Sequence, residues 1–305
     1  MASYILRRCF YAIFVLFGVA TIVFFLTRLT GDPIAIMLPP DASAEQITAF
    51  RVMLGYDKPL PEQYLIYISK LLKLDFGTSI RYYAPTLGLI LERLPATIQL
   101  ASASLILSLL LAIPAGILAA LKRGSLFEQG IMIFALFGQS MPVFWMGILF
   151  VILFAVNLRW FPTGGYGDWK YLVLPAVALG LRLMALVTRL LRSSLIEVME
   201  SDYIRTARAK GLLPFTVIAK HAFRNSMLPV VTVVGLEIGS LLGGSVVTET
   251  VFAWPGVGQL LVQAINFRDF PLVQAIIILL ACAFVFINLV VDILYVFIDP
   301  RIQYK

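Results

Sequence analysis

Long apolar runs, separated by short charged segments, make up most of this chain. Five of the runs contain at most two charged residues each, and a sixth, weaker run carries Arg182. A bilayer core about 30 Å thick needs roughly 20 mostly apolar residues per helix, and the runs have about that length or more. The sequence therefore predicts an all-α polytopic membrane protein with six transmembrane helices, at residues 9–27, 95–121, 129–158, 171–188, 227–251 and 271–298.

Composition agrees with this pattern and excludes an ordinary soluble domain. Hydrophobic residues account for 60% of the chain and charged residues for 13%, with a mean hydropathy of +0.93. A typical soluble domain has about 45–50% apolar and about 25% charged residues. Lipid is therefore the main surrounding of this protein.

Lys and Arg set the predicted orientation, because cytoplasmic loops near span ends are enriched in them. Arg7 and Arg8 precede the first run, Lys122 and Arg123 follow the second, and seven basic residues lie at 189–225. Placing them on the cytoplasmic side puts both termini in the cytoplasm. The net charge of +7 then reflects topology, and no nucleic acid is expected, because no basic stripe is interleaved with stacking aromatics.

The predicted spans divide the chain into three regions. Residues 1–30 form an N-terminal anchor helix and not a cleaved signal, because the run is long and no A-x-A-like cleavage site follows it. Residues 31–94 form an external segment. Residues 95–305 form a membrane core with five transmembrane helices and a cytoplasmic loop at 189–226. Cys9 and Cys282 lie in distant apolar runs, which indicates neither a disulfide framework nor a metal site.

Two short amphipathic helices are expected in the external segment. Ser43 to Gln46 forms a capping-box pattern before a helix that stops near Gly55. A second helix begins near Pro61 and places Tyr64, Leu65, Ile68, Leu71 and Leu72 on one face. The helices either lie on the bilayer surface or over the spans, or they form a platform for a delivery protein.

The loop at 189–225 has clear helix start and stop signals. Asp202 is expected to cap a helix that begins at Tyr203, and Lys210 with Gly211 is expected to end it. Pro214 suits the first turn of a second helix that runs through Asn225 toward the next span. Helices this short are marginal alone, so either a partner protein packs on them or the loop folds back on its own spans.

Enzyme chemistry is absent from the motifs of this chain. His221 is the only histidine, so metal sites rich in histidine are excluded and His-based triads are disfavoured. No G-x-S-x-G elbow and no G-x-x-x-x-G-K-[ST] loop occurs, so the chain is not expected to hydrolyse ATP. The stretch Gly243-Gly244-Ser245 is more typical of close helix packing.

Ionisable residues inside the predicted spans are the remaining candidates for function. A central Arg or Asp in a span costs about 2.5–3.5 kcal/mol, so such residues should face protein or water. Arg182 and Glu237 are expected to form an ion pair, with Asp292 near the inner end of the last span, although proton relay or substrate contact stays open. Pro142 should kink the third span beside Gln139 and Ser140, at a point that could line a cavity.

Several motifs together resemble one family. They are Gly31-Asp32-Pro33, Asp75-Phe76-Gly77-Thr78-Ser79, Thr206 to Gly211, Lys220 to Asn225 with Pro229, Val251 to Gly258, and the ending Asn288 to Asp292 with Asp299-Pro300-Arg301. The chain resembles the B-type permease subunit of a bacterial ATP-binding-cassette importer of the dipeptide, oligopeptide and nickel group. The general importer signature has Glu-Ala-Ala, three residues, Gly, nine residues and Ile-x-Leu-Pro. Ala207 and Gly211 match it, whereas Arg205 and Thr206 replace its Glu and first Ala.

The resemblance implies a role for the loop and for other subunits. In that family the loop holds a coupling helix that inserts into a cytoplasmic ATPase. The expected partners are a C-type permease in a heterodimer, two ATPases, a periplasmic or lipid-anchored binding protein, and membrane lipid. No cofactor is expected on this chain, with ATP and Mg²⁺ bound by the ATPases, and the location is the bacterial inner membrane. The coupling residues so implied are Asp202, Tyr203, Arg205, Thr206, Ala207, Arg208, Ala209, Lys210, Gly211, His221, Arg224 and Asn225.

The transported substrate stays open among short peptides, nickel or a nickel chelate, and glutathione. The segment 251–270 is expected to form a shallow re-entrant hairpin near the outer gate. An ion-coupled carrier acting alone is the alternative from another class, but no internal inverted repeat is visible. The candidate pore or gate residues are Gln139, Ser140, Pro142, Arg182, Glu237, Trp254 and Pro255.

Overall fold

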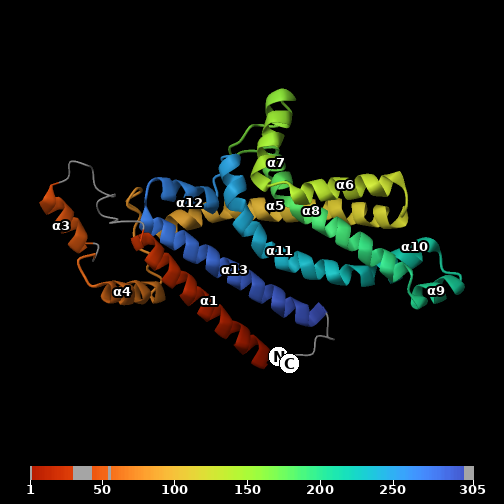
Figure 1. Ribbon diagram of the computed structural model, residues 1–305, viewed down its shortest axis with the longest axis horizontal. Helices are drawn as coiled ribbons and strands as arrows, with labels where there is room; N and C mark the ends of the chain where they lie inside the picture. The colour runs from red at the N-terminus through yellow and green to blue at the C-terminus, as the bar shows by residue number, and fades with distance from the viewer. Residues whose placement is uncertain (1, 30–42, 54–55, 299–305) are drawn as a thin grey trace. The chain divides into compact units, whose positions relative to one another are not determined.

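The computed structural model describes residues 2–29, 43–53 and 56–298, and most of that length is helical (Figure 1). Gly31-Asp32-Pro33 and Asp299-Pro300-Arg301 lie outside the described residues. The helices are α1 Ala2–Leu29, α3 Ala44–Met53, α4 Leu60–Leu72, α5 Thr86–Leu121, α6 Leu126–Ser140, α7 Val143–Phe150, the π-helical η1 Val151–Asn157, α8 Trp169–Met199, α9 Asp202–Ala209, α10 Pro214–Thr216, the π-helical η2 Val217–Ala222, α11 Phe223–Val251, α12 Val257–Asn266 and α13 Phe270–Ile298.

The chain divides into two compact units, each built from two stretches of sequence. The first unit consists of Met1–Ala96 and Pro255–Val285, and the second consists of Thr97–Trp254 and Phe286–Lys305. Residues 255–285 thus belong to the same unit as the N-terminal region.

Within the described residues, five helices are long and apolar enough to cross a membrane, and one bent pair raises the number to six if it is a single span. The predicted all-helical fold is confirmed, and the six predicted spans agree with the upper of these two counts. The helices extend beyond the predicted apolar runs, because charged residues can occupy the ends of a helix outside the hydrocarbon core. The helix α5 begins at Thr86, ahead of the predicted start at Pro95, and its 36 residues correspond to about 54 Å.

The predicted third span, 129–158, is not one straight helix. The helix α6 ends at Ser140, α7 begins at Val143, and the two segments are bent by 110°. Met141 and Pro142 are both extended, because a proline lacks the N–H and disfavours a helical conformation in the residue before it. The kink predicted at Pro142 is therefore correctly placed, but the helix breaks there completely.

In the first unit, the capping box at Ser43 is confirmed, and the predicted second helix is present as α4. The Ser43 hydroxyl accepts a hydrogen bond from the Gln46 N–H at 3.2 Å, and the Gln46 side chain accepts one from the Ser43 N–H at 2.9 Å. Leu65 and Leu72 of α4 are exposed. Tyr64, a member of the predicted face, and Tyr67 pack against Phe24 of α1, with ring centroids 5.1 and 5.3 Å from that of Phe24.

Asp269 joins the loop after α4 to the start of α13 within the same unit. Its buried carboxylate accepts hydrogen bonds from the Ser79 hydroxyl and from the N–H groups of Ile80 and Arg81, at 3.3 and 3.2 Å for the latter two. It also accepts a 3.3 Å hydrogen bond from the N–H of Leu272, which lies in the first turn of α13. The motif Asp75 to Ser79 thus ends in a loop that one buried carboxylate fixes in place.

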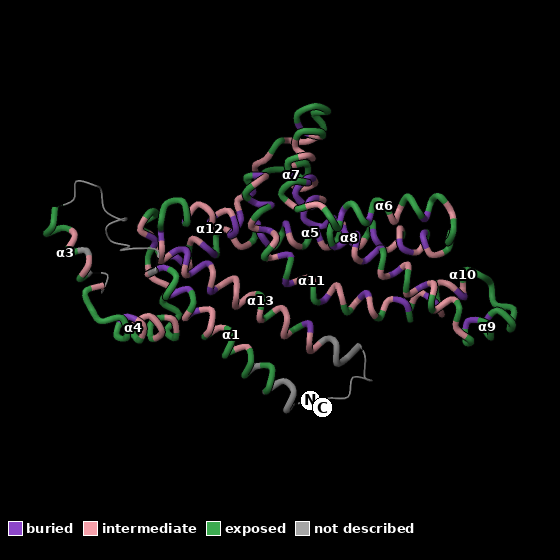
Figure 2. Tube along the Cα trace, in the orientation of Figure 1, coloured by how far each residue is buried: buried purple, intermediate pink, exposed green. Residues whose placement is uncertain are grey.

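In the second unit, α8 packs closely against α6 and α11 and contacts α5 at Gly180, and it is the most buried of the five single-helix spans (Figure 2). A Cβ atom at Gly180 of α8 would lie 2.8 Å from the Ser104 carbonyl oxygen of α5, and the Ser108 hydroxyl donates a 2.7 Å hydrogen bond to the Gly180 carbonyl. On α11, Gly244 approaches Leu179 of α8, whereas Gly243 faces open space. The expected close packing at Gly243-Gly244-Ser245 therefore involves Gly244 and the buried Ser245.

Gly180→Ala is expected to destabilise the second unit by about 1–3 kcal/mol, because its methyl group overlaps the α5 backbone. Thermal unfolding of the purified protein in detergent measures the effect. Gly243→Ala is the matched control, since its methyl group meets nothing within 4 Å. Equal melting temperatures for the two variants would contradict the close contact at Gly180.

Candidate functional site

The predicted helix in the loop between α8 and α11 is present as α9. Its N-cap is Ser201, in an extended conformation, so the helix begins one residue earlier than predicted. Asp202 lies in the first turn, where a carboxylate is favoured by the helix dipole, and it pairs with Arg205 at 3.4 Å. Lys210 caps the other end, and Gly211 follows with φ +77°, which confirms the predicted left-handed stop.

One face of α9 is buried against the protein's own helices. Ile204 is 0% exposed and packs with Ala207, with Leu195 of α8 and with Val217 and Ala222 of η2. Two side chains of α5, Ile117 and Ala120, cover this cluster, which we call the α9 core. An eight-residue helix has little stability alone, so the α9 core is what holds it. Ala207 therefore faces inward, away from any docking partner.

The opposite face of α9 and the turn after it are exposed and carry basic and aromatic side chains. Tyr203 is 44% exposed and accepts a 2.8 Å hydrogen bond from Asn225 of α11. Phe215 is 81% exposed and Leu213 is also exposed. We call this surface the α9 face; its other exposed members are Asp202, Arg205, Thr206, Arg208, Ala209, Lys210 and Gly211.

The predicted second helix is also present. It begins at Pro214 and continues without a break through α10, η2 and α11 to Val251. His221 is half-buried in η2, and Arg224 is exposed in the first turn of α11. Because α8 enters the loop and this helix leaves it, a displacement of α9 moves both spans.

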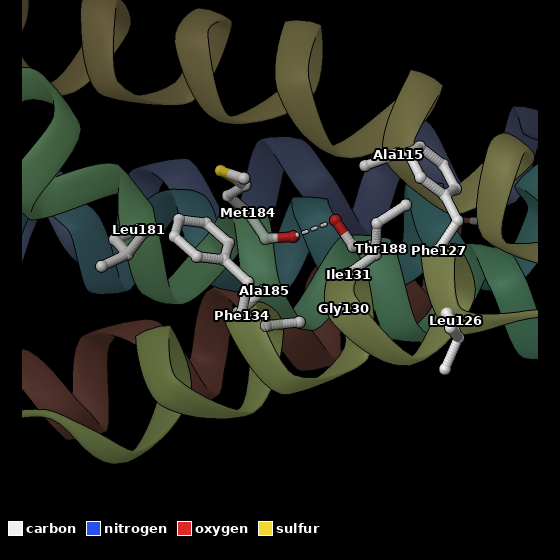
Figure 3. A pocket seen from close by; sticks show the side chains of 11 residues that line it. Ala115, Leu126, Phe127, Gly130, Ile131, Phe134, Leu181, Met184, Ala185 and Thr188 are labelled. Atoms are coloured by element: carbon white, nitrogen blue, oxygen red, sulfur yellow. Dashed lines mark hydrogen bonds between the residues drawn. The ribbon is translucent and has the colours of Figure 1, made fainter.

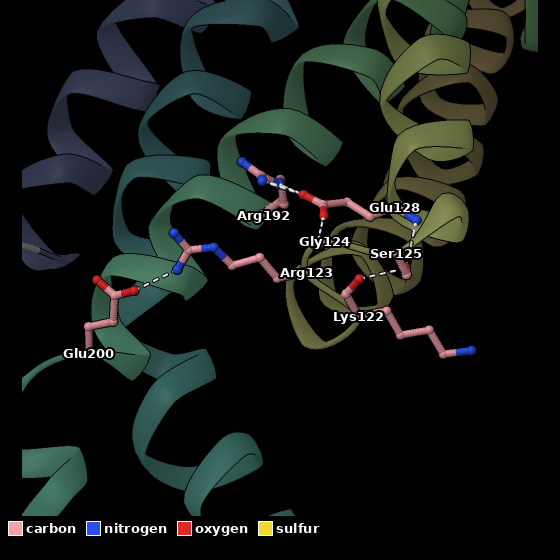
Figure 4. Close-up of polar contacts among 7 residues, drawn as sticks. All are labelled: Lys122, Arg123, Gly124, Ser125, Glu128, Arg192 and Glu200. Atoms are coloured by element: carbon pink, nitrogen blue, oxygen red, sulfur yellow. Dashed lines mark hydrogen bonds and ion pairs between the residues drawn. The ribbon is translucent and has the colours of Figure 1, made fainter.

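Two ion pairs that sequence reasoning missed bind the start of α6 to α8 (Figure 4). Glu128, in the first turn of α6, pairs with Arg192 of α8 and accepts a 2.5 Å hydrogen bond from the Gly124 N–H. Arg123 pairs with Glu200 at the end of α8 at 2.6 Å. The sequence held one signal, because Ser125 and Glu128 have capping-box spacing and Ser125 is the N-cap of α6.

These contacts join α9 and the neighbouring ends of α5, α6, α8 and η2. Arg123 and Glu128 bind the α5–α6 turn to α8, and the α9 core binds α9 to α5, α8 and η2. Packed elements of this kind move as rigid bodies because their interfaces deform little. A force applied to α9 therefore reaches α5 and α6 as well as α8 and α11.

The candidate pore residues of the second unit form polar contacts along α8. The predicted pair of Arg182 with Glu237 is present at 3.4 Å, and Arg182 is largely exposed. Arg189, seven residues further along α8 on the same face, donates to the Gln139 side chain at the end of α6. The Ser140 hydroxyl donates a 2.9 Å hydrogen bond to the Leu136 carbonyl of the same helix, α6. An exposed arginine inside a span must face protein or water, and not lipid.

Trp254 has a different environment from those residues. It is 1% exposed and packs against Tyr166, with ring centroids 4.8 Å apart. The nearby Glu249 is fully buried and accepts a 2.8 Å hydrogen bond from Thr97 of α5. Trp254 thus anchors the end of α11, and it lines no open surface of the second unit. Pro255, half-buried, begins the stretch that leads into α12, which has 10 residues and is too short to span a membrane.

A cavity of about 410 Å³ lies between α5, α6 and α8 (Figure 3). Its lining is almost entirely apolar, with Phe134 of α6 beside Leu181 and Met184 of α8, and Phe127 of α6 near Ala115 of α5 at the other end. The Thr188 hydroxyl in its wall already donates to the Met184 carbonyl at 2.8 Å. This cavity contains no charged side chain. It differs in this from the contacts of Arg182 with Glu237 and of Arg189 with Gln139, which we call the polar row on α8.

Two family models together match nearly the whole chain. The model described as "Binding-protein-dependent transport system inner membrane component" matches residues 112–304, and the model of its N-terminal part matches residues 1–101. The di/tripeptide transport system permease protein DppB of Pseudomonas aeruginosa is 41% identical, and the glutathione transport system permease protein GsiC of Escherichia coli K12 is 42% identical. Both alignments cover 100% of each chain.

Solved structures of the MetNI methionine ABC transporter in inward-facing conformations have a similar fold. Two crystal forms give TM-scores of 0.57 and 0.59 at 18% and 17% identity, and each covers 70% of this chain and 98% of the solved chain. This likeness shows the fold alone, and the full-length relatives show the class of protein. The chain belongs to the inner-membrane components of binding-protein-dependent transport systems and is a permease subunit of an ATP-binding-cassette importer, whose ATP hydrolysis takes place on a separate subunit.

Proposed function

We propose that this chain forms half of a translocation path for dipeptides and oligopeptides in the bacterial inner membrane. The observation that carries the proposal is the 41% identity, over the full length of both chains, with a permease named for di/tripeptide transport. Glutathione is the second candidate, because a glutathione permease is 42% identical over the same extent. Both substrates are short peptides with charged ends.

The α9 face is the proposed docking surface for a cytoplasmic ATPase subunit. Its exposed Tyr203 and Phe215 are aromatic anchors of the kind that dominate protein interfaces, and basic side chains surround them. The buried side of the same helix is fixed to four other elements by the α9 core and its neighbouring ion pairs. The helix therefore suits the transfer of a rigid-body motion from the ATPase to the spans.

The polar row on α8 supports a lining role in the proposed path. Arg182, Glu237, Arg189 and Gln139 place both signs of charge and an amide on adjacent helices of the second unit. A peptide in solution carries one carboxylate and one ammonium end, so a surface with both signs matches it. Ser140 and Pro142 are included at the break between α6 and α7. Pro255 is the candidate gate residue, whereas the buried Trp254 has the supporting role of holding the end of α11.

The remaining subunits and the orientation complete the proposal. A C-type permease forms the other half of the path, and a periplasmic or lipid-anchored protein delivers the peptide. Two ATPase subunits bind ATP and Mg²⁺, and this chain binds no cofactor of its own. The basic residues near the span ends favour a topology with both termini in the cytoplasm.

Uptake by the reconstituted complex tests this function. Vesicles that contain the chain, its partner permease, both ATPases and the binding protein should accumulate a labelled dipeptide only when ATP is supplied. Labelled glutathione, offered separately, decides between the two peptide substrates. Vesicles that contain this chain alone, given an ion gradient, are the control, and uptake in those vesicles would contradict the proposal.

A further inference from the structure

A second cavity, of about 200 Å³, lies within the first unit among α1, α4, α13 and the loop after α4. A single water needs only about 10–15 Å³ of such space, so this cavity has room for a larger group. It is lined by both polar and apolar side chains. Its charged and hydrogen-bonding members include Arg28, Tyr67, Lys70, Asp75 and Gln274. We call it the Arg28 cavity.

Arg28 is a half-buried cation that forms no ion pair with any carboxylate of the described residues. Its Nε donates to the Gln63 side chain at 2.9 Å, and its Nη1 donates to the Phe24 carbonyl at 3.2 Å. The guanidinium also lies over the Phe24 ring, 3.5 Å from its centroid. These contacts fix its position, and Nη2 has no hydrogen-bond acceptor among the residues that the structure describes. A partly buried cation without an ion-pair partner favours binding of an anion, because the anion would compensate its charge.

The Tyr67 hydroxyl supplies a second donor without a partner. It is the one buried side-chain polar atom of the described residues that makes no hydrogen bond. Burial raises the pKa of Tyr67 above its usual range, so the hydroxyl keeps its proton and can donate. Leaving such a group unpaired costs about 1–3 kcal/mol, which an acceptor in the cavity would recover.

Lys70 lies one turn after Tyr67 on α4 and adds a second cation to the lining. Asp75 brings one negative charge, and its carboxylate accepts a 2.9 Å hydrogen bond from the Gly77 N–H. The charged side chains around the cavity therefore sum to one net positive charge. Three donors from three residues suit a tetrahedral oxyanion better than a flat carboxylate, and Arg with Lys is a common phosphate-binding combination.

The position of Arg28 along its span indicates where such an anion would come from. Arg28 is the last residue of the candidate span Phe10–Arg28, whose 19 residues correspond to about 28 Å of helix. A bilayer core is about 30 Å thick, so the two ends of this span lie at the depth of lipid headgroups. Basic pockets between membrane helices bind phosphorylated headgroups elsewhere by the same chemistry.

We propose that the Arg28 cavity binds the phosphate group of a membrane phospholipid, with Arg28, Tyr67 and Lys70 as its ligands. The inference requires only that α1 spans the membrane, and it does not depend on the transported substrate. A bound lipid would neutralise Arg28 and fill the space between α1, α4 and α13. It would thus be a structural component of the first unit.

Native mass spectrometry of the full chain, purified with its partner subunits and delipidated, tests the proposal. Phosphatidylglycerol, a diacylglycerol with the same acyl chains, and inorganic phosphate are titrated separately. Phosphatidylglycerol should give a tightly bound lipid, and diacylglycerol should not. Tyr67→Phe and Lys70→Gln should each raise the dissociation constant of the most tightly bound phosphatidylglycerol by about fivefold to tenfold, as expected for loss of one charge-assisted hydrogen bond.

Lys73→Gln is the matched control, because Lys73 is exposed, follows α4 and does not line the cavity. Its lipid binding should equal that of the wild type. Equal binding of diacylglycerol and phosphatidylglycerol, or unchanged binding in both Tyr67→Phe and Lys70→Gln, would overturn the site. Displacement of the lipid by inorganic phosphate would overturn the lipid assignment, because it would identify soluble phosphate as the occupant.

Discussion

Gly211→Pro is expected to abolish ATP-driven uptake while the chain still inserts into the membrane. Gly211 has φ +77°, and proline is fixed near −65°, so the variant cannot form the turn that ends α9. Proline also removes the N–H that donates a 3.0 Å hydrogen bond to the Arg208 carbonyl. The strain is about 1–3 kcal/mol, and it is concentrated where α9 turns back toward η2. Uptake of labelled peptide by the reconstituted complex measures the loss.

Gly211→Asn separates backbone conformation from steric bulk. A Cβ atom at Gly211 meets nothing within 4 Å, and asparagine tolerates the left-handed conformation while keeping its N–H. Uptake in this variant should therefore remain within about threefold of the wild type. If Gly211→Pro transported normally, or if Gly211→Asn were as defective as the proline variant, the turn at Gly211 would not be what couples the loop to transport.

Local signals made the loop predictable from sequence. Gly211 permits a left-handed turn, Pro214 fixes its own φ, and Lys210 places a positive charge at the C-terminal end of α9. Each effect is a property of one residue, so predicting it required no knowledge of tertiary contacts. The start of α9 was placed one residue late because Ser201 and Asp202 are both good caps, and only the observed backbone distinguishes them. The number of spans could be predicted too, because the length of an apolar run is a property of one short stretch of sequence and depends on no distant contact.

Features that depend on tertiary packing could not be predicted in this way. Leu65 and Leu72 share the predicted apolar face of α4 with Tyr64, but the spacing alone does not tell that Tyr64 and Tyr67 contact Phe24 of α1 while the two leucines are exposed. The Glu128–Arg192 pair joins residues 64 positions apart, and no periodic pattern relates them. The break at Pro142 was located by its residue type, but its angle of 110° depends on the packing of α6 and α7 against α8.

Ile204→Ala is expected to release α9 from the spans without unfolding them. Ile204 is fully buried in the α9 core, and removing its side-chain carbons leaves a cavity that costs about 2–5 kcal/mol. An eight-residue helix cannot absorb that loss, because its own hydrogen bonds are marginal in water. The amides of α9 should then exchange with solvent at least tenfold faster, since about 1.4 kcal/mol corresponds to a factor of ten.

The same release should uncouple ATP hydrolysis from uptake, because a loosely held α9 cannot move α5, α6, α8 and α11 together. Ile204→Val removes less volume, so it should lower the stability of the packed α9 by only about 0.5–1.5 kcal/mol and reduce uptake by an intermediate amount. Ile133→Ala is the matched control, since Ile133 of α6 is exposed and the same atoms are deleted. Hydrogen exchange localised to α9, measured beside peptide uptake in one preparation, checks both consequences. Normal α9 exchange in Ile204→Ala, or equal losses of uptake in Ile204→Ala and Ile133→Ala, would show that the α9 core does not carry the motion.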